Sequence, residues 1–134
     1  MLIAGDSGSI FLSVTPTDVL SGRRVCPNTP VNFTCIANRI TVLRWLRNGT
    51  EIEDFTSRDN APIQRQLGSF TVYLNSSTMA SDGTLNVTST LVGYTGSGLQ
   101  SGDRIECLDA TGETRVLNFT LTCESIGQVS FICN

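Results

Sequence analysis

The positions of one tryptophan and two cysteines constrain this chain more than any other feature of its sequence. Cys35 ends an alternating run in which it shares one side of an extended strand with Val31 and Phe33, while the residues between them are polar. The only tryptophan, Trp45, follows ten residues later, and Cys107 closes a further short strand far downstream. These positions predict half-buried strands that meet in one core.

This order of cysteine, tryptophan and cysteine resembles the immunoglobulin superfamily, in which a disulfide joins two facing sheets and the tryptophan packs against it. The resemblance implies a Cys35–Cys107 disulfide with Trp45 beside it. The long separation of the two cysteines suits the nine-strand variable type rather than the shorter constant type. Trp45-Leu46-Arg47 also resembles the matching strand of variable-type domains, which implies that Trp45 points inward and Leu46 outward.

Alternating apolar residues and turn residues predict the remaining strands. We expect strands at residues 10–14, 31–35, 41–47, 51–55, 70–74, 85–91, 103–107 and 115–122, with a short extended segment at 23–26. Asn48-Gly49 predicts a two-residue type I′ hairpin, because both residues tolerate a positive φ. Residues 56–68 contain a proline and a glycine and predict a weak edge strand or a loop. The predicted fold is an all-β, two-sheet antiparallel Greek-key sandwich, immunoglobulin-like and of variable type, with eight or nine strands.

Length and composition predict one globular domain. The chain has 134 residues, of which 40% are hydrophobic and 16% charged. We expect a loose segment at 1–9, the domain at 10–123, and a tail or the start of a linker at 124–134. The net charge of −3 and the scattered arginines give no footprint for nucleic acid. No apolar run reaches membrane-spanning length, so any membrane anchor is expected outside this fragment.

The strand that contains Cys107 departs from the family pattern. Two and six residues before this cysteine the family has tyrosine and aspartate, whereas this chain has Ile105 and Ser101. The tyrosine-corner hydrogen bond is therefore not expected. In the family, the arginine that matches Arg47 pairs with the aspartate, and the resemblance implies that Asp103 takes this role from its shifted position.

Five cysteines in a small β-rich chain predict an oxidising compartment. In variable-type domains the segment before the Cys35 strand lies beside the end of the last strand, so the resemblance implies a Cys26–Cys123 bridge. A Cys123–Cys133 bridge is the open alternative, and Cys133 otherwise pairs outside this set. The chain has no Cys-x-x-Cys spacing and no histidine, which argues against a zinc site.

N-glycosylation sequons support the same compartment. They occur at Asn32, Asn48, Asn75, Asn86 and Asn118, whereas the composition gives roughly two by chance. Strand parity predicts that Asn32, Asn75 and Asn86 face outward on one sheet and that Asn118 faces outward on the other. We therefore expect an extracellular protein, either secreted or part of a cell-surface ectodomain.

Nothing in the sequence predicts catalysis. Without histidine, the commonest general base and every Ser-His or Cys-His arrangement are missing. Glu51 and Glu53 are expected on one side of a strand, as a carboxylate pair, a calcium site or, more commonly, a solvated charged face. The glycines at 93–102 lack the lysine and the helix of a phosphate loop. We expect a non-enzyme with no cofactor and no small-molecule substrate.

The resemblance implies non-catalytic recognition or cell adhesion by one module of a larger receptor-type ectodomain. A structural spacer without its own ligand and a free secreted immune-type effector are the alternatives. The expected partner is a protein, bound homophilically or heterophilically, and the candidate partner-binding residues are Leu46, Glu51, Glu53 and Leu108. The Trp-Leu-Arg and Gly-Asp-Arg-Ile-Glu-Cys runs look like those of immunoglobulin modules in invertebrate receptors, including sponge-type adhesion proteins and receptor kinases.

Overall fold

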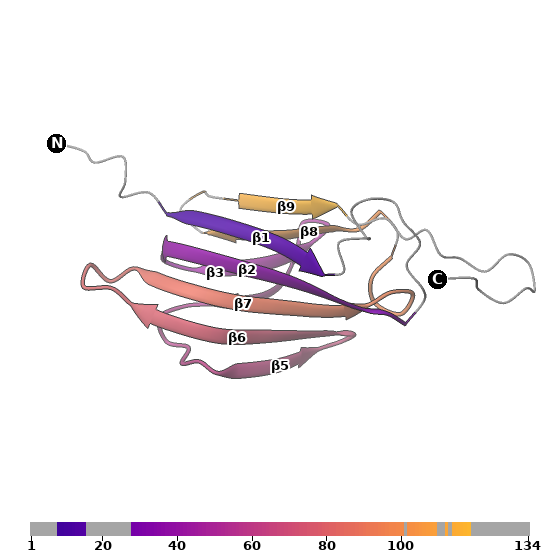
Figure 1. The fold of residues 1–134 in the computed structure, drawn as a ribbon, viewed down its shortest axis with the longest axis horizontal. Coiled ribbons are helices and arrows are strands. Elements are labelled where there is room, and N and C mark those ends of the chain that lie inside the picture. The colour runs from indigo at the N-terminus through magenta and orange to yellow at the C-terminus, as the bar shows by residue number, and fades with distance from the viewer. Residues whose placement is uncertain (1–7, 16–27, 101, 110–111, 113, 119–134) are drawn as a thin grey trace, which may run out of the picture.

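The protein is an all-β sandwich of two antiparallel sheets (Figure 1). The structure is a computed structural model that describes residues 8–15, 28–100, 102–109, 112 and 114–118. The strands are β1 (Ser9–Thr15), β2 (Pro30–Ile40), β3 (Leu43–Arg47), β4 (Thr50–Phe55), β5 (Ile63–Leu67), β6 (Phe70–Met79), β7 (Leu85–Tyr94), β8 (Arg104–Asp109) and β9 (Thr114–Asn118). One sheet has the order β1-β2-β7-β6-β5 and the other β4-β3-β8-β9. The described residues contain no helix, and the predicted two-sheet antiparallel sandwich is confirmed.

The core lies between the sheets and is built by alternation along each strand. In β2, Val31, Phe33 and Cys35 are buried while the residues between them face outward. In β1, Ile10 and Leu12 are buried in the same way. Period-two burial is what one solvated face and one packed face impose on an antiparallel sheet. The alternation seen in the sequence therefore sets which face of each strand enters the core.

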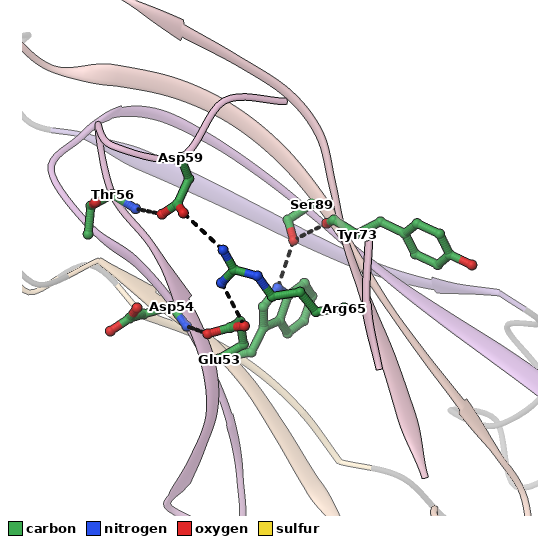
Figure 2. A network of polar contacts seen from close by, with 8 residues as sticks. Glu53, Asp54, Thr56, Asp59, Arg65, Tyr73 and Ser89 are labelled. Carbon is green, nitrogen blue, oxygen red and sulfur yellow. Dashed lines mark hydrogen bonds and ion pairs between the residues drawn. The ribbon is translucent and has the colours of Figure 1, made fainter. Parts of the chain in front are cut away.

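The centre of the core holds the predicted disulfide and tryptophan. Cys35 on β2 is bonded to Cys107 on β8, so the bridge joins the two sheets. Trp45 on β3 pairs with Cys107 in the sheet register and is fully buried. Its indole Nε1 donates to Ser89 Oγ at 2.9 Å, and that hydroxyl donates to the Tyr73 carbonyl at 2.6 Å (Figure 2). The indole N–H, which would be costly to bury alone, therefore has a partner.

The hairpin between β3 and β4 has the predicted turn. Asn48 has φ of 52° and Gly49 has φ of 84°, so both central residues adopt the left-handed conformation that a type I′ turn requires. The Asn48 N–H donates to the Arg104 carbonyl at 2.9 Å. The turn is thus fixed both by its own residues and by the neighbouring β8.

The segment at 56–68 contains an edge strand, β5, as predicted. This strand belongs to the five-stranded sheet, which is not the sheet that gains extra strands in variable-type domains. β5 pairs with β6 at the edge of the five-stranded sheet, whereas both extra strands of variable-type domains join the sheet of β3, β8 and β9. The local reason is the tight connection through Gly68, whose φ is 62°, which places Leu67 opposite Phe70. β4 alone extends the other sheet.

The prediction that Glu51 and Glu53 share one side of a strand is wrong, because β4 carries a bulge. Trp45 pairs with Glu53, but the next residue, Leu46, pairs with Glu51, so Ile52 is an extra residue on β4. One inserted residue reverses the facing of everything beyond it in a strand of period two. Glu53 therefore lies on the inner side with Trp45, while Glu51 lies on the outer side with Leu46.

Several predictions fall outside the described residues. They are the short segment at 23–26, the strand beyond 118, the end segments 1–7 and 124–134, and the pairing of Cys26, Cys123 and Cys133. The backbone of Asn118 is described as the end of β9, but its side chain is not.

Candidate functional site

An open groove lies where the β3–β4 hairpin approaches the β5–β6 hairpin. Its volume is about 480 Å³, and it is lined by Arg47, Asn48, Thr50, Glu51, Ile52, Leu67 and Phe70. We call it the hairpin groove. Its apolar residues come from both sheets and its polar residues from one hairpin, so an apolar floor has a polar and charged rim. This size and composition suit a few side chains of a bound partner.

The rim of the hairpin groove is fixed by Asp103, in the turn before β8. Arg47 Nε donates to Asp103 Oδ2 at 2.9 Å, Asn48 Nδ2 donates to Oδ1 at 3.0 Å, and the Gln100 N–H donates to Oδ2 at 2.8 Å. The Asp103 side chain is only 7% exposed. We call these four residues the Asp103 cluster. The predicted Arg47–Asp103 pair is confirmed. The turn before β8 brings Asp103 to Arg47 although Asp103 stands two residues later in the chain than the family's aspartate.

Arg47 also contacts the other sheet. Its guanidinium carbon lies 5.6 Å from the centre of the Phe70 ring, within the range of a cation–π contact. Asn48 Oδ1 accepts from the Arg104 N–H at 2.9 Å, so both polar atoms of the Asn48 side chain are bound. The groove therefore presents its charge and its amide on side chains that are already ordered, which lowers the entropic cost of binding.

A second cluster joins the two sheets at their edges (Figure 2). Arg65 on β5 donates through Nη1 to Glu53 Oε2 at 2.8 Å, on β4, and through Nη2 to Asp59 Oδ1 at 3.1 Å. Its guanidinium carbon lies 5.4 Å from the centre of the Phe55 ring. We call these residues the Arg65 cluster. The hydrogen bond that Arg65 donates to Glu53 is the main cause that raises the pKa of Arg65 above its ordinary value.

The carboxylates of the Arg65 cluster also bind amide groups of the β4 edge. Glu53 Oε1 accepts from the Asp54 N–H at 3.0 Å, and Asp59 Oδ2 accepts from the Thr56 N–H at 2.8 Å. β4 is the outermost strand of its sheet, and unpaired amides on such a strand invite another chain to pair with it. The cluster thus closes this side of the sandwich and satisfies part of its edge.

The outer face of the four-stranded sheet carries three of the four predicted partner-binding residues. Leu46 and Leu108 are half-buried diagonal neighbours there, since Leu46 pairs with Glu106 and Arg44 with Leu108. Glu51 lies on the same face, with Oε1 at 3.5 Å from Arg44 Nε. Glu53 does not join them, because the bulge directs it to Arg65. A Glu51–Glu53 carboxylate pair or calcium site is therefore removed by geometry.

The described sequons divide into two groups. Asn32, Asn75 and Asn86 are exposed on the outer side of the five-stranded sheet, as strand parity predicted. Asn48 lies instead at the rim of the hairpin groove, with its side-chain nitrogen donating to Asp103.

The structure also exposes apolar side chains that our reading of the sequence did not single out. Among the described residues, Phe11 is 62% exposed, and Ile36, Met79 and Tyr94 are exposed as well. All four belong to the five-stranded sheet. The signal was present in the alternation, because Phe11 stands between the inward Ile10 and Leu12.

Neither metal ligation nor a membrane span emerges from the described part of the chain. No group of three or more His, Cys, Asp or Glu side chains there could hold a metal ion. No helix in that part is long and apolar enough to cross a membrane.

Comparison with protein-family models, with curated proteins and with solved structures finds no match to this chain. The two antiparallel sheets and the Cys35–Cys107 disulfide between them are compatible with an immunoglobulin-like fold.

Proposed function

We propose that this domain is an extracellular, non-catalytic recognition module that binds a protein partner through the hairpin groove. The observation that carries the proposal is the groove itself, an open apolar floor from two sheets with a charged rim whose side chains are held in place. Preorganised polar groups around an apolar pocket favour specific binding. A structural spacer has no need of such a groove.

The compartment rests on two observations. The core is bridged by a disulfide, which persists in oxidising surroundings, and three sequons lie exposed on one face. Together they support a secreted or cell-surface protein, as one module of a receptor-type or adhesive ectodomain.

We further infer a relationship to variable-type immunoglobulin domains, and more narrowly to modules of sponge-type invertebrate receptors. The supporting features are the cysteine and tryptophan positions, the Trp-Leu-Arg run and the Arg47–Asp103 pair. The placement of β5 beside β6 is a departure from that type. The inference about function rests on the groove and not on the relationship.

The test uses the glycosylated, disulfide-intact domain coupled to beads. Bead-to-bead aggregation and matching self-association in sedimentation would indicate a homophilic partner, and binding to cells alone would indicate a heterophilic one. Thr50→Trp fills the groove from an exposed rim position, and Thr15→Trp places the same side chain on an exposed position of β1. We expect Thr50→Trp to weaken binding about tenfold or more and Thr15→Trp to leave it unchanged. Thr50→Ala removes the Asn48 sequon as Thr50→Trp does but adds no bulk to the groove, and it should also leave binding unchanged.

All three variants must melt at the wild-type temperature for this comparison to hold. Equal binding by the two tryptophan variants, or no binding by the wild type to beads or cells, would overturn the proposal and favour the spacer.

A further inference from the structure

Phe11 and Ile36 form an exposed apolar pair on the five-stranded sheet. They are direct cross-strand neighbours on β1 and β2, and they are 62% and 40% exposed. Their strand neighbours on the same side, Ser13 and Thr34, are polar. Large apolar side chains side by side, with polar neighbours on their own strands, indicate that something covers them.

Asn86 lies next to this pair. Ile36 pairs with Thr88 on β7, and Asn86 is the next outward residue of β7, so Asn86 and Ile36 are diagonal neighbours at roughly 7–8 Å. Asn86 stands opposite a bulge of β2 at residues 38–39, between the Ala37–Val87 and Ile40–Leu85 pairs. The sequon Asn86-Val87-Thr88 therefore begins beside the apolar pair.

The Asn86 side chain is oriented by the bulge. Its Oδ1 accepts from the Arg39 N–H at 3.2 Å, and Arg39 has φ of 58°. No hydrogen bond involves its Nδ2 nitrogen within the described part of the chain, and the residue is exposed. The nitrogen that would carry a sugar is thus free while the oxygen holds the side chain in place.

The other described sequons differ in their surroundings. Asn48 uses its Nδ2 nitrogen to bind Asp103. Asn75 lies on β6, two strands away from β2, and its Oδ1 accepts a hydrogen bond from Thr90 Oγ1 at 2.9 Å. Asn32 lies on β2 and pairs with Thr15 at the end of β1. It is four residues, or two outward-facing positions, away from Ile36 on the same strand. Of these four asparagines, Asn86 is the one that lies next to the Phe11–Ile36 pair with its side-chain nitrogen free.

We propose that an N-linked glycan on Asn86 lies over Ile36 and Phe11 and covers them. The apolar C–H face of an N-acetylglucosamine ring packs on an aromatic face, whose electron density is negative, and removes apolar surface from water. The first sugar reaches Ile36 as the diagonal neighbour, and the second extends toward Phe11 one strand further. The proposal rests on the extracellular location proposed above, since only chains that enter the secretory pathway, whether secreted or destined for the cell surface, meet the modifying enzyme.

The covalent step balances with a lipid-diphosphate-linked oligosaccharide as donor. A bond forms between Asn86 Nδ2 and C1 of the first N-acetylglucosamine, and the bond between C1 and the diphosphate oxygen breaks. The nitrogen loses one proton, and the lipid diphosphate leaves with the bonding electron pair.

The experiment uses two matched substitutions, each of which removes one sequon and leaves its asparagine intact. Thr88→Ala removes the Asn86 sequon and preserves the hydrogen bond that the Arg39 N–H donates to Asn86 Oδ1. Thr34→Ala removes the Asn32 sequon from the same face. Both are made in wild-type and Phe11→Ser backgrounds, secreted from eukaryotic cells, and also produced without glycosylation in bacteria. Peptide mass spectrometry gives occupancy, and thermal melting and sedimentation give stability and self-association.

We expect Asn86 to be occupied, and Thr88→Ala to lower the melting temperature of the glycosylated protein by about 3 °C and to promote self-association. In the Phe11→Ser background both effects shrink to those of Thr34→Ala. In the unglycosylated protein the two threonine substitutions have equal, small effects.

Three results would overturn the inference. One is an unmodified Asn86 in secreted protein whose Asn32 and Asn75 are modified, which would leave the proposed function intact. A second is an equal effect of Thr88→Ala in the two backgrounds. A third is self-association of the fully glycosylated wild type that Phe11→Ser abolishes, because a second copy would then cover the pair. If the protein is not secreted and none of its sequons carries a glycan, that result would count against the proposed function as well.

Discussion

Two arginines in this molecule have nearly the same surroundings and different tasks. Arg47 lies over Phe70 at 5.6 Å and bonds a carboxylate at 2.9 Å, while Arg65 lies over Phe55 at 5.4 Å and bonds a carboxylate at 2.8 Å. The Asp103 carboxylate, however, accepts hydrogen bonds from three donors and lies in the turn before β8, in the same sheet as Arg47. The Arg65 cluster uses two carboxylates and bridges two sheets.

The difference shows that location, not chemistry, decides what an ion pair does. The Asp103 carboxylate is almost fully buried, so a missing donor there leaves an uncompensated charge in the protein. Glu53 and Asp59 are 16% and 19% exposed, and water can replace part of what Arg65 supplies. The Asp103 cluster is therefore expected to govern stability, and the Arg65 cluster to govern the behaviour of one edge.

The largest effect is expected from Arg47→Ala. Breaking a buried pair costs roughly 3–5 kcal/mol, and since the Arg47 side chain is 32% exposed, we expect about 3 kcal/mol of lost unfolding free energy. Urea denaturation measures this loss. Arg47→Lys is the matched control, and it should recover part of the stability because it restores the charge but not the fixed fork of donors. A loss below that of Arg65→Met would reverse the ranking of the two clusters.

Arg65→Met comes second, at about 1.5 kcal/mol, because it keeps the apolar stem and loses two partly exposed ion pairs. Hydrogen exchange should report a local change that Arg47→Ala does not produce. The amides of Asp54 and Thr56 lose carboxylate partners that Arg65 holds in place, so their exchange should accelerate. Unchanged exchange at both amides would show that the cluster does not protect the β4 edge.

Asn48→Gln should lower the free energy of unfolding by about 1 kcal/mol. We expect the same loss in the glycosylated and the unglycosylated protein. The longer side chain fits the left-handed turn poorly and misplaces the bonds to Asp103 and Arg104. Thermal melting of bacterial and secreted protein makes the comparison, with Asn32→Gln as a control outside the Asp103 cluster. A loss confined to the glycosylated protein would mean that Asn48 serves mainly as a sugar acceptor.

The smallest effect is expected at Asp82, a carboxylate that belongs to neither cluster. The hydrogen bond from the Thr84 side chain is the main cause that lowers its pKa below the ordinary 3.8. A lowered folded-state pKa adds stability above the unfolded value, and that stability is lost as the pH falls through the folded value. Wild type and Thr84→Val should therefore differ slightly at neutral pH and converge below about pH 4 in denaturation curves. A gap that persists in acid would assign the effect to packing.

The sequence carried the parts of the fold that depend on local pattern. Alternation around Cys35 and the Asn48-Gly49 turn follow from neighbouring residues, whereas the inward position of Trp45 was implied by the family resemblance, and the structure agrees with all three. The Arg47–Asp103 pair was reachable through a family pattern even though its aspartate is displaced.

The parts that escaped prediction depend on how strands meet. The bulge at Ile52 sends Glu51 and Glu53 to opposite sides of the sheet, and its trace in the sequence is small: Ile52 and Phe55 are three residues apart, which interrupts the alternation of β4. The Arg65 cluster follows from that bulge and from the pairing of β5 with β6. The groove depends on the same two hairpins, so no single segment could have revealed it.

The Cys35–Cys107 bridge has a mechanical consequence. β1 and β9 lie side by side and point the same way, so tension applied at the start of one and the end of the other shears them apart (Figure 1). Beyond that first rupture the bridge takes the load, because it ties β2 to β8 across a separation of 72 residues. At about 3.5 Å per residue, roughly 250 Å of contour stays locked until the covalent bond is reduced. Under tension the domain would then lengthen only by its outer strands, and a reductant would convert it from a short tether into a long one.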